Sequence, residues 1–539
     1  MIKSIKTISS LEKLYMEDNM PEIEFSKFSM LKNEKKSFQI VVESSKNSVE
    51  NFKIHSDIKV IRTYKVKHIK SDLPMTKKDS DDYYRFSESG YYPDLLLPFF
   101  DQVQLETGLN VIWIEVDANG SEPNSYNIVT EVGEKVSSIA VEIIDAELDF
   151  NNFVYTNWFH TDCLMSYYDF EAFSDKYWQV TENFLKTAAE YGMNCVLTPI
   201  FTPPLDTDVG KERPTVQLVD VEVVDNKYTF RFDNLTKWID IARKCGIEYF
   251  ELSHFYTQWG AKHAPKIMAT VDGCYKKIFG WETNAGSKDY KNFLKVFSDE
   301  LKNYLASEGI EDKVFIHVSD EPNIRMVRHY RNASKYIHKL FKGYKIIDAL
   351  SDFWFYKLKI VSNPIPANDH IDKFIGKVEN LWTYYCSAQK SQYVSNRFFC
   401  NSSLRTRILG YQLYKYDVKG FLHWGYNFYY TQLSKELINP FEVSDAGENF
   451  PSGDSFIVYP SDDGTPLHSI RLKVFFDALQ DMAALNTLEK LTNKNYCLKI
   501  IEQDIAPITF KDYPHDNDWL LNTREKINSK IQENLTVKK

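Results

Sequence analysis

The sequence of 539 residues lacks the features that mark membrane and disulfide-rich secreted proteins. It has no run of about 18 apolar residues, which excludes a helical membrane span. Residues 1–19 mix Lys and Glu with apolar residues and hold no uninterrupted apolar core, so we read no signal peptide and expect a cytoplasmic protein. The 7 cysteines form no Cys-x-x-Cys pair, which indicates reduced thiols.

An excess of positive charge and the common nucleotide motifs are also missing. Lys and Arg number 65 against 75 Asp and Glu, and this net charge of −10 gives no electrostatic footprint for a nucleic acid. No Gly-x-Gly-x-x-Gly or P-loop motif follows a predicted strand, and no Gly-x-Ser-x-Gly elbow supplies a serine nucleophile. Hydrophobic residues make up 43% and charged residues 26%, as in globular proteins.

Residues 1–152 read as a chain of short strands. Apolar and polar residues alternate with a period of two in four segments, which is typical of antiparallel strands with one buried face. We therefore predict an antiparallel β-sandwich, without clustered catalytic residues, as the first domain. The four segments are residues 37–42, 58–64, 109–116 and 137–144.

After residue 153, long amphipathic helices alternate with short apolar runs. Gly192, Gly246 and Gly309 each follow a helical pattern and precede a strand, as expected where a helix ends in a left-handed residue. This alternation predicts a parallel sheet built from βαβ units, and a (β/α)8 barrel fits better than a doubly wound sheet.

The predicted fold is a multidomain α/β protein with three parts. Seven strands are predicted in the barrel, the first at 154–160 and the last at 420–425, with an eighth placed at 393–399. An amphipathic helix over 468–491 would close the barrel. The parts are a β-sandwich (1–152), the TIM-like barrel (153–491) and a C-terminal helical appendage and tail (492–539).

Two adjacent acids follow the strand predicted at 313–318. In barrels of this kind the active site lies at the C-terminal ends of the strands, where Asp320 and Glu321 stand. We expect Pro322 to hold Glu321 extended, and one carboxylate to push the other toward its protonated form. The competing interpretation is that Asp320 or Asn323 simply caps a helix over 324–341.

Other predicted strand ends carry aromatic, hydroxyl, amide and imidazole side chains. Aromatic rings beside polar groups suit a sugar, because sugars have apolar C–H faces rimmed by hydroxyls. The parity of the strand favours Tyr385 as the hydroxyl of its segment. The candidate substrate-binding residues are His160, Asp162, His254, Trp382, Tyr385, Trp424 and Asn427.

A metal-dependent barrel hydrolase stays open as an alternative. Imidazole and carboxylate ligands could come from His160, Asp162, His254, His317, Asp320 and His423. The motif is weak, because the His-x-His pair of barrel metallohydrolases is His-x-Asp at 160–162. We therefore predict no metal and no cofactor, and keep an inactive carbohydrate-binding protein as a further alternative.

Three segments resemble a known family. Residues 408–427, 453–460 and 469–472 closely resemble domain of unknown function 4091, which belongs to glycoside hydrolase family 123. The motif Val318-Ser-Asp-Glu-Pro322 looks like the catalytic Asp-Glu pair of that family, and 157–163 looks like its first barrel strand. The resemblance spans residues 153–491.

The resemblance implies a retaining exo-β-N-acetylhexosaminidase of the N-acetylgalactosaminidase type, in which the 2-acetamido group of the substrate is the nucleophile. Asp320 would then orient that group as it closes into an oxazolinium ion, and Glu321 would protonate the glycosidic oxygen and later deprotonate water. The expected partner is a carbohydrate with a terminal N-acetylhexosamine and not a nucleic acid; homo-oligomer formation is left open.

Overall fold

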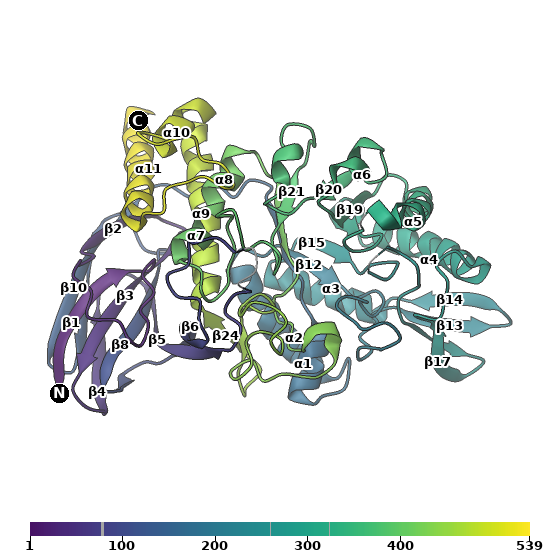
Figure 1. Ribbon diagram of the computed structural model, residues 1–539, viewed down its shortest axis with the longest axis horizontal. Helices are drawn as coiled ribbons and strands as arrows, with labels where there is room; N and C mark the ends of the chain where they lie inside the picture. The colour runs from purple at the N-terminus through teal and green to yellow at the C-terminus, as the bar shows by residue number, and fades with distance from the viewer. Residues whose placement is uncertain (77–79, 259, 323, 539) are drawn as a thin grey trace.

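The computed structural model describes residues 1–76, 80–258, 260–322 and 324–538, and two facing sheets form its N-terminal part (Figure 1). Phe38, Ile40 and Val42 of one sheet and Val141 and Ile143 of the other are buried in the core between them. Their spacing of two residues is the predicted alternation, and the β-sandwich is confirmed. The seven-stranded sheet has the order β1 (Ile2–Ser9), β3 (Lys35–Ser44), β8 (Gly108–Asp117), β5 (Val60–Ser71), β6 (Gly90–Pro98), β24 (Pro466–Ser469) and β23 (Tyr459–Pro460); the five-stranded sheet has the order β2 (Lys27–Leu31), β10 (Lys135–Ile144), β9 (Ser125–Val132), β4 (Ser48–His55) and β7 (Gln102–Leu105).

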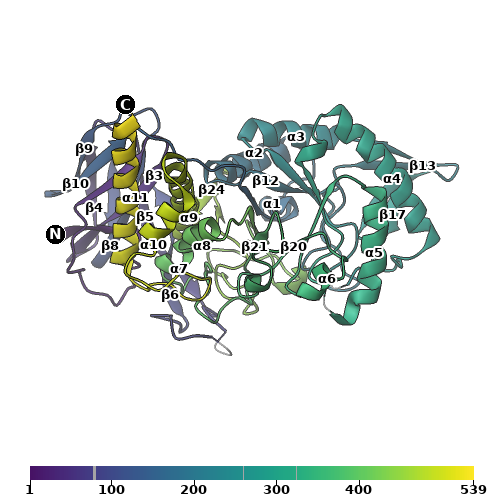
Figure 2. The ribbon, with the colours of Figure 1, turned by 90° about the horizontal axis from the view of Figure 1, so that it is seen from above.

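Eight parallel strands then form a barrel beside the sandwich (Figures 1 and 2). Neighbours in the sheet follow the order of the chain, and hydrogen bonds beyond the last strands close the ring: the Tyr384 N–H donates to the Pro366 carbonyl at 3.2 Å, and the Asn368 N–H to the Tyr384 carbonyl at 2.9 Å. The predicted (β/α)8 barrel is confirmed. Its strands are β11 (Val154–Asn157), β12 (Cys195–Thr198), β15 (Tyr249–Leu252), β18 (Val314–Ile316), β19 (Lys345–Ala349), β20 (Asn363–Ile365), β21 (Trp382–Tyr384) and β22 (Gly420–His423).

The strand missing from the sequence prediction is β20, and the segment 393–399 is not a strand. β20 has three residues, and Pro364 is one of them. A segment this short shows no alternation, and proline usually argues against a strand, so the pattern could not reveal it.

The helices that follow the first barrel strands cover the outside of the barrel (Figure 2). Gly192 and Gly246 have φ of 90° and 100° after α2 and α3, so they end these helices as predicted. The helices are α1 (Thr161–Tyr168), α2 (Asp175–Glu190), α3 (Asp233–Cys245), α4 (Lys288–Ser307), α5 (Val327–Leu340), α6 (Phe353–Lys357), α7 (Ser403–Arg407) and α8 (Leu409–Lys415), with short 3-10 turns η1 (Glu311–Lys313), η2 (Ile324–Met326), η3 (Ile371–Lys373) and η4 (Gln432–Ser434).

A four-stranded sheet projects from the barrel at the right of Figure 1. It is not among the predicted elements. Its order is β14 (Lys227–Arg231), β13 (Asp220–Val224), β16 (Ile267–Val271) and β17 (Cys274–Phe279).

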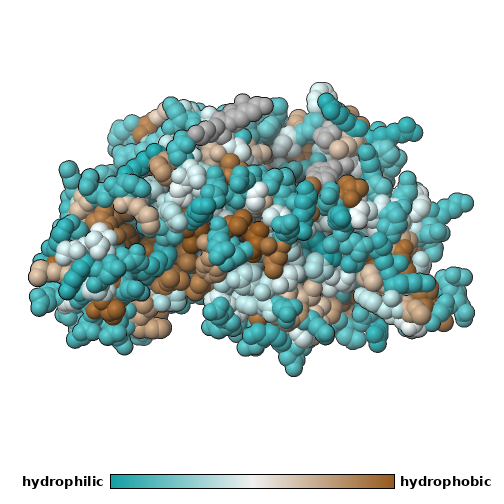
Figure 3. Space-filling model, turned by 60° about the horizontal axis from the view of Figure 1, so that its bottom comes forward, coloured by the Kyte–Doolittle hydropathy of each residue, from teal (hydrophilic) through white to brown (hydrophobic). Residues whose placement is uncertain are grey.

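The face of the molecule in Figure 3 is largely hydrophilic, with apolar groups gathered near its middle. No helix among the described residues is long and apolar enough to cross a membrane.

The C-terminal chain joins the barrel to the sandwich through α9 (Ile470–Leu491), α10 (Lys494–Ile501) and α11 (Asn517–Lys538). The first sixteen residues of α9 are all buried, so the predicted amphipathic helix is wrong in this respect. Its charged side chains are paired and not solvated: Arg471 binds Asp94 at 2.8 Å and Lys473 binds Glu115 at 2.8 Å. The domain boundaries at 152 and 491 stay predictions.

Candidate active site

The chain turns sharply after β18, where the adjacent acids lie. The Val318 and Ser319 N–H groups both donate to Asp348 Oδ1, at 2.9 and 3.3 Å. Glu321 then has φ of 40°, so the expectation that Pro322 holds it extended is wrong. This turn leaves Asp320 half-buried and Glu321 exposed, which gives the two carboxylates different surroundings.

Tyr384, at the end of β21, donates a hydrogen bond from its hydroxyl to Glu321 Oε1 at 2.7 Å. Burial, followed by the charge of Glu321, raises the pKa of Tyr384 well above its usual value, so the phenol keeps its proton. The predicted hydroxyl is that of Tyr385, but Tyr384 and Trp382 share the inner face of the barrel, and the buried Tyr385 packs on the opposite face against Phe421. The strand parity was therefore assigned to the wrong face.

Asp320 is the carboxylate whose protonated form the structure favours. Burial raises its pKa well above the ordinary value, and the negative charges of Glu321 and Asp348 raise it further, while His317 opposes them. This agrees with the expectation that one acid of the pair is pushed toward its protonated form.

A buried hydrogen-bonded chain lies beneath the pair. Glu251 of β15 accepts from Thr156 Oγ1 at 2.7 Å, from Trp158 Nε1 at 2.8 Å and from His317 Nε2. Burial alone would lower the pKa of His317, but Glu251 and Asp348 raise it to about 9, so the ring carries a positive charge at neutral pH. Glu251 is not among the predicted site residues, although a lone acid within an apolar strand indicates a paired group.

His254 lies beside this chain. Its ring stacks on His317 with centroids 4.4 Å apart, and Trp158 meets it edge-on at 5.3 Å. Neither ring nitrogen has a hydrogen-bond partner among the described residues, and burial lowers the pKa of His254 well below its usual value. The ring is therefore a neutral imidazole with unused polar atoms at the end of β15.

His160, Asp162 and Asn427 form a separate buried network centred on Arg213. The Arg213 guanidinium donates to both oxygens of Asp162, at 2.7 and 2.8 Å, and to His160 Nδ1 at 3.1 Å. Asn427 Oδ1 accepts from the His160 N–H at 2.9 Å. Burial lowers the pKa of His160 to about 3, so it stays neutral. These groups satisfy one another, and no local pattern points to Arg213, which is distant along the chain.

Trp424 and Trp382 lie at different ends of the barrel. Trp424 is half-buried and donates from Nε1 to Asp454 Oδ2 at 2.9 Å; burial raises the pKa of Asp454 to about 7. Trp382 instead packs edge-on against Phe315, with centroids 5.0 Å apart, and lines a cavity at the N-terminal ends of the strands. The structure therefore does not bring Trp382 together with Asp320 and Glu321.

A helix cap and a metal site are the two alternatives to a catalytic pair at Asp320. Asn323 lies outside the described residues. α5 begins at Val327 after Met326 with no side-chain cap, so Asp320 does not cap α5, while a cap at the start of η2 (Ile324–Met326), where the predicted helix begins, stays a prediction. Within the described part of the chain, no group of three or more His, Cys, Asp and Glu residues is placed to hold a metal ion.

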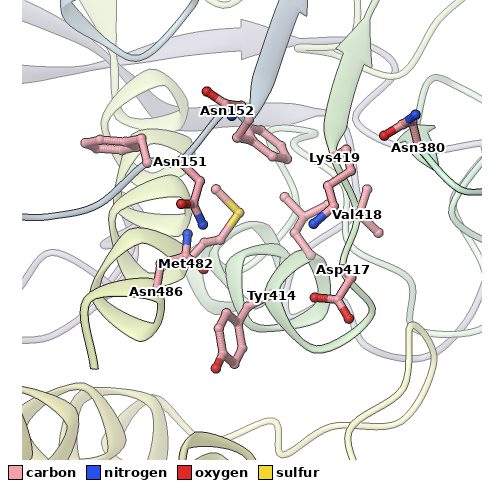
Figure 4. Close-up of a pocket in the computed structure, with 12 residues that line it drawn as sticks. Asn151, Asn152, Asn380, Tyr414, Asp417, Val418, Lys419, Met482 and Asn486 are labelled. Atoms are coloured by element: carbon pink, nitrogen blue, oxygen red, sulfur yellow. The ribbon is translucent and has the colours of Figure 1, made fainter. Parts of the chain in front are cut away.

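Cavities open at both ends of the barrel. A cleft of about 720 Å³ is lined by Glu321, Tyr384 and residues of α6 and η3, at the C-terminal ends of the strands. At the other end, a cavity of about 420 Å³ places Asn151 and Asn486 across from Asp417 and Lys419 (Figure 4). Because barrel active sites lie at the C-terminal ends, the cleft beside Glu321 is the candidate active site.

Most of the barrel matches a known sequence family. The sequence model described as glycoside hydrolase 123, catalytic domain, matches residues 158–488, which is more than half of the chain. No curated protein matches the sequence.

A solved structure of low sequence identity has the same fold. A family 123 glycoside hydrolase from Clostridium perfringens, analysed for the details of glycolipid glycan hydrolysis, is 15% identical with a TM-score of 0.76 and covers 99% of this chain and 100% of its own. A putative alpha-galactosidase from Bacteroides fragilis is 8% identical and covers 86% of this chain and 78% of its own. Its TM-score of 0.25 is too low to indicate a shared fold. The resemblance inferred from the sequence is confirmed: the chain belongs to glycoside hydrolase family 123 and is a glycosidase.

Proposed function

We propose that the protein removes a terminal β-linked N-acetylhexosamine with retention of configuration, and that the 2-acetamido group of the substrate is the nucleophile. In the reactive state Glu321 carries the proton of the pair and Asp320 is the carboxylate. Glu321 protonates the glycosidic oxygen and then activates water, and Asp320 orients the acetamido group as it closes on the anomeric carbon. The observation that carries the proposal is the adjacent pair at the end of β18, with Glu321 open to the cleft and Asp320 half-buried behind it.

The neighbouring carboxylates support substrate assistance. A retaining enzyme with two carboxylates needs a free nucleophile about 5–5.5 Å from the acid. Glu251 is held by Thr156, Trp158 and His317, and Asp162 is held at both oxygens by Arg213. These acids are engaged in buried hydrogen bonds, so the acetamido group is the better source of the nucleophile.

Asp454 is a further acid to test as a protein nucleophile. One of its oxygens accepts from Trp424, and the other has no hydrogen-bond partner among the described residues. If it were the nucleophile, Asp454→Asn would abolish turnover, and added azide would restore it with a glycosyl azide as product. Under our proposal the variant gives no azide product.

The direct test uses paired 4-nitrophenyl β-glycosides that differ only in a 2-acetamido or a 2-hydroxyl group, each assayed with and without chelator. We expect turnover of the acetamido member alone, unchanged by chelator. Turnover of the hydroxyl member would require a protein nucleophile, and loss with chelator would support the metal-dependent alternative. Binding of both without turnover would support an inactive carbohydrate-binding protein. Because the Clostridium perfringens structure concerns glycolipid glycan hydrolysis, glycolipid glycans are the first natural substrates to assay.

A further inference from the structure

The cleft beside Glu321 continues away from the catalytic pair, over α6 and η3. We propose that this cleft is the subsite for the leaving group, and that it favours a leaving-group sugar carrying an anionic substituent, a carboxylate or a sulfate. This inference rests on the proposed function, because it assigns the acid to Glu321.

The position of the two acids fixes which part of the substrate enters the cleft. Glu321 and Tyr384 line it, whereas Asp320 is not among its lining residues. If Asp320 contacts the acetamido group and Glu321 protonates the glycosidic oxygen, the leaving group extends from Glu321 away from Asp320. A volume of about 720 Å³ lies within the usual range of ligand pockets.

An aromatic platform forms part of the wall. Trp354 is 56% exposed, which is unusual for a large aromatic side chain, and it lies on α6. Asp352 caps this helix by accepting from the Trp354 N–H at 3.0 Å, which fixes the start of the turn. An exposed indole face at the mouth of a glycosidase cleft can pack against the C–H face of a sugar ring.

Positive charge surrounds this platform. Lys357 and Lys373 line the cleft, and neither forms an ion pair with another described residue; Lys357 Nζ lies 4.5 Å from the centroid of the Trp354 ring. Lys377 lies next to them, 4.8 Å from the Phe353 centroid.

The cleft has fewer carboxylates than lysines when Glu321 is protonated. Besides Glu321, the carboxylate of Asp352 lines the cleft, and His370, which also lines it, binds Asp369 at 2.6 Å. When Glu321 holds the proton that it donates, Asp352 is the carboxylate that remains among the described lining residues, against the two lysines Lys357 and Lys373. The cleft then has an excess of positive charge, which complements an anionic leaving group.

The test compares kcat/KM for three disaccharides in which the N-acetylhexosamine is linked to glucose, to glucuronic acid or to glucose 6-sulfate. The hydroxyl that leaves is similar in all three, so their ratio reports the charge of the subsite. We expect at least one of the two anionic disaccharides, the one whose anion reaches the lysines, to be preferred by about tenfold at low ionic strength. This corresponds to about threefold for each of the two exposed lysines. Added salt should reduce the preference.

The matched variants are Lys357→Met with Lys373→Met, which keep the apolar stems, and Lys53→Met on the exposed surface of β4. The double variant should bring the anionic-to-neutral ratio near one, and Lys53→Met should keep the parental ratio. Equal kcat/KM for all three disaccharides in the parent, or a ratio that the double variant does not change, would overturn the inference. Turnover of aryl N-acetylhexosaminides but of no disaccharide would also overturn it and leave the proposed function standing, whereas no turnover of aryl N-acetylhexosaminides would overturn the proposed function itself.

Discussion

The two ends of the barrel are both hollow, and their difference shows what identifies an active site. The cleft of about 720 Å³ at the C-terminal end holds Glu321 beside Tyr384, next to a second carboxylate. The cavity of about 420 Å³ at the N-terminal end is rich in amides and places Asn151 and Asn486 opposite Asp417 and Lys419 (Figure 4). Both volumes lie within the usual range of ligand pockets, so volume does not decide which end is the candidate active site; the adjacent acids at the end of β18 do.

The two ends of the barrel also differ in how their residues affect stability. At the C-terminal end, a left-handed backbone at Glu321 and a half-buried acid are tolerated, and both cost stability. At the N-terminal end, Trp382 and Gly420 sit opposite each other in the register of β21 and β22 and pack closely. We therefore expect substitutions at the first end to change turnover and those at the second end to change stability.

The largest expected effect is that of Glu321→Gln. Loss of the general acid should lower kcat/KM about 1000-fold for glycosides with poor leaving groups and far less for 2,4-dinitrophenyl glycosides, which need no protonation. Kinetics across a series of leaving groups measures this. The control at the other end is Asn380→Ala, a cavity residue that should leave kcat/KM within about twofold. Equal losses for good and poor leaving groups would contradict the role of Glu321.

Asp320→Asn should lower kcat/KM about 100-fold for good and poor leaving groups alike, because formation of the cyclic intermediate is impaired in every case. The same series of leaving groups provides the measurement. Retention of full activity would remove Asp320 from the mechanism.

Gly420→Ala tests the folding end. An added Cβ would collide with the Trp382 ring, so we expect the free energy of unfolding to fall by about 1–3 kcal/mol. Denaturant unfolding measures the loss, and Trp382→Phe in the same chain should recover part of it by giving the Cβ room. The folded variant should keep kcat/KM within about twofold; a large loss of turnover at unchanged stability would place Trp382 against the substrate.

The smallest expected effect is a dependence of stability on pH at Asp320. Its folded pKa is raised, first by burial and then by Glu321, so the folded state binds more protons than the unfolded chain above about pH 4. The contribution of Asp320 to the stability of the parent therefore falls as pH rises through the folded pKa. Asp320→Asn cannot lose this proton, so its Tm should exceed that of the parent at about pH 7.5 and approach it near pH 4.5. A difference in Tm that is the same at both pH values would contradict the raised pKa.

Much of the fold followed from sequence because its signals are local. Alternation predicted the sandwich strands, and helices that end at Gly192 and Gly246 predicted the βαβ units. The three-residue β20 and the buried α9 were missed or misread, since a strand with a proline shows no pattern and paired charges on a buried helix look like a solvated face.

The candidate site could be predicted only where its residues are adjacent in the chain. Asp320 and Glu321 could be selected as a pair because their strand and their order are visible in the sequence. Tyr384, Glu251 and Arg213 were not selected, because each acts through a partner more than fifty residues away, and only the closed barrel brings the partners together. His160, Asp162 and Asn427 were selected as sugar ligands, but the structure shows them bound to Arg213 or to one another.

The measurement that tests the central claim most directly is the inhibition constant of a thiazoline analogue of the cyclic oxazolinium intermediate, compared with that of the free N-acetylhexosamine. A site built to stabilise that intermediate should bind the analogue at least about 100-fold more tightly than the sugar, and Asp320→Asn should reduce this advantage. Equal inhibition by the analogue and the sugar, in an enzyme that turns over N-acetylhexosaminides, would contradict neighbouring-group catalysis by Asp320 and Glu321.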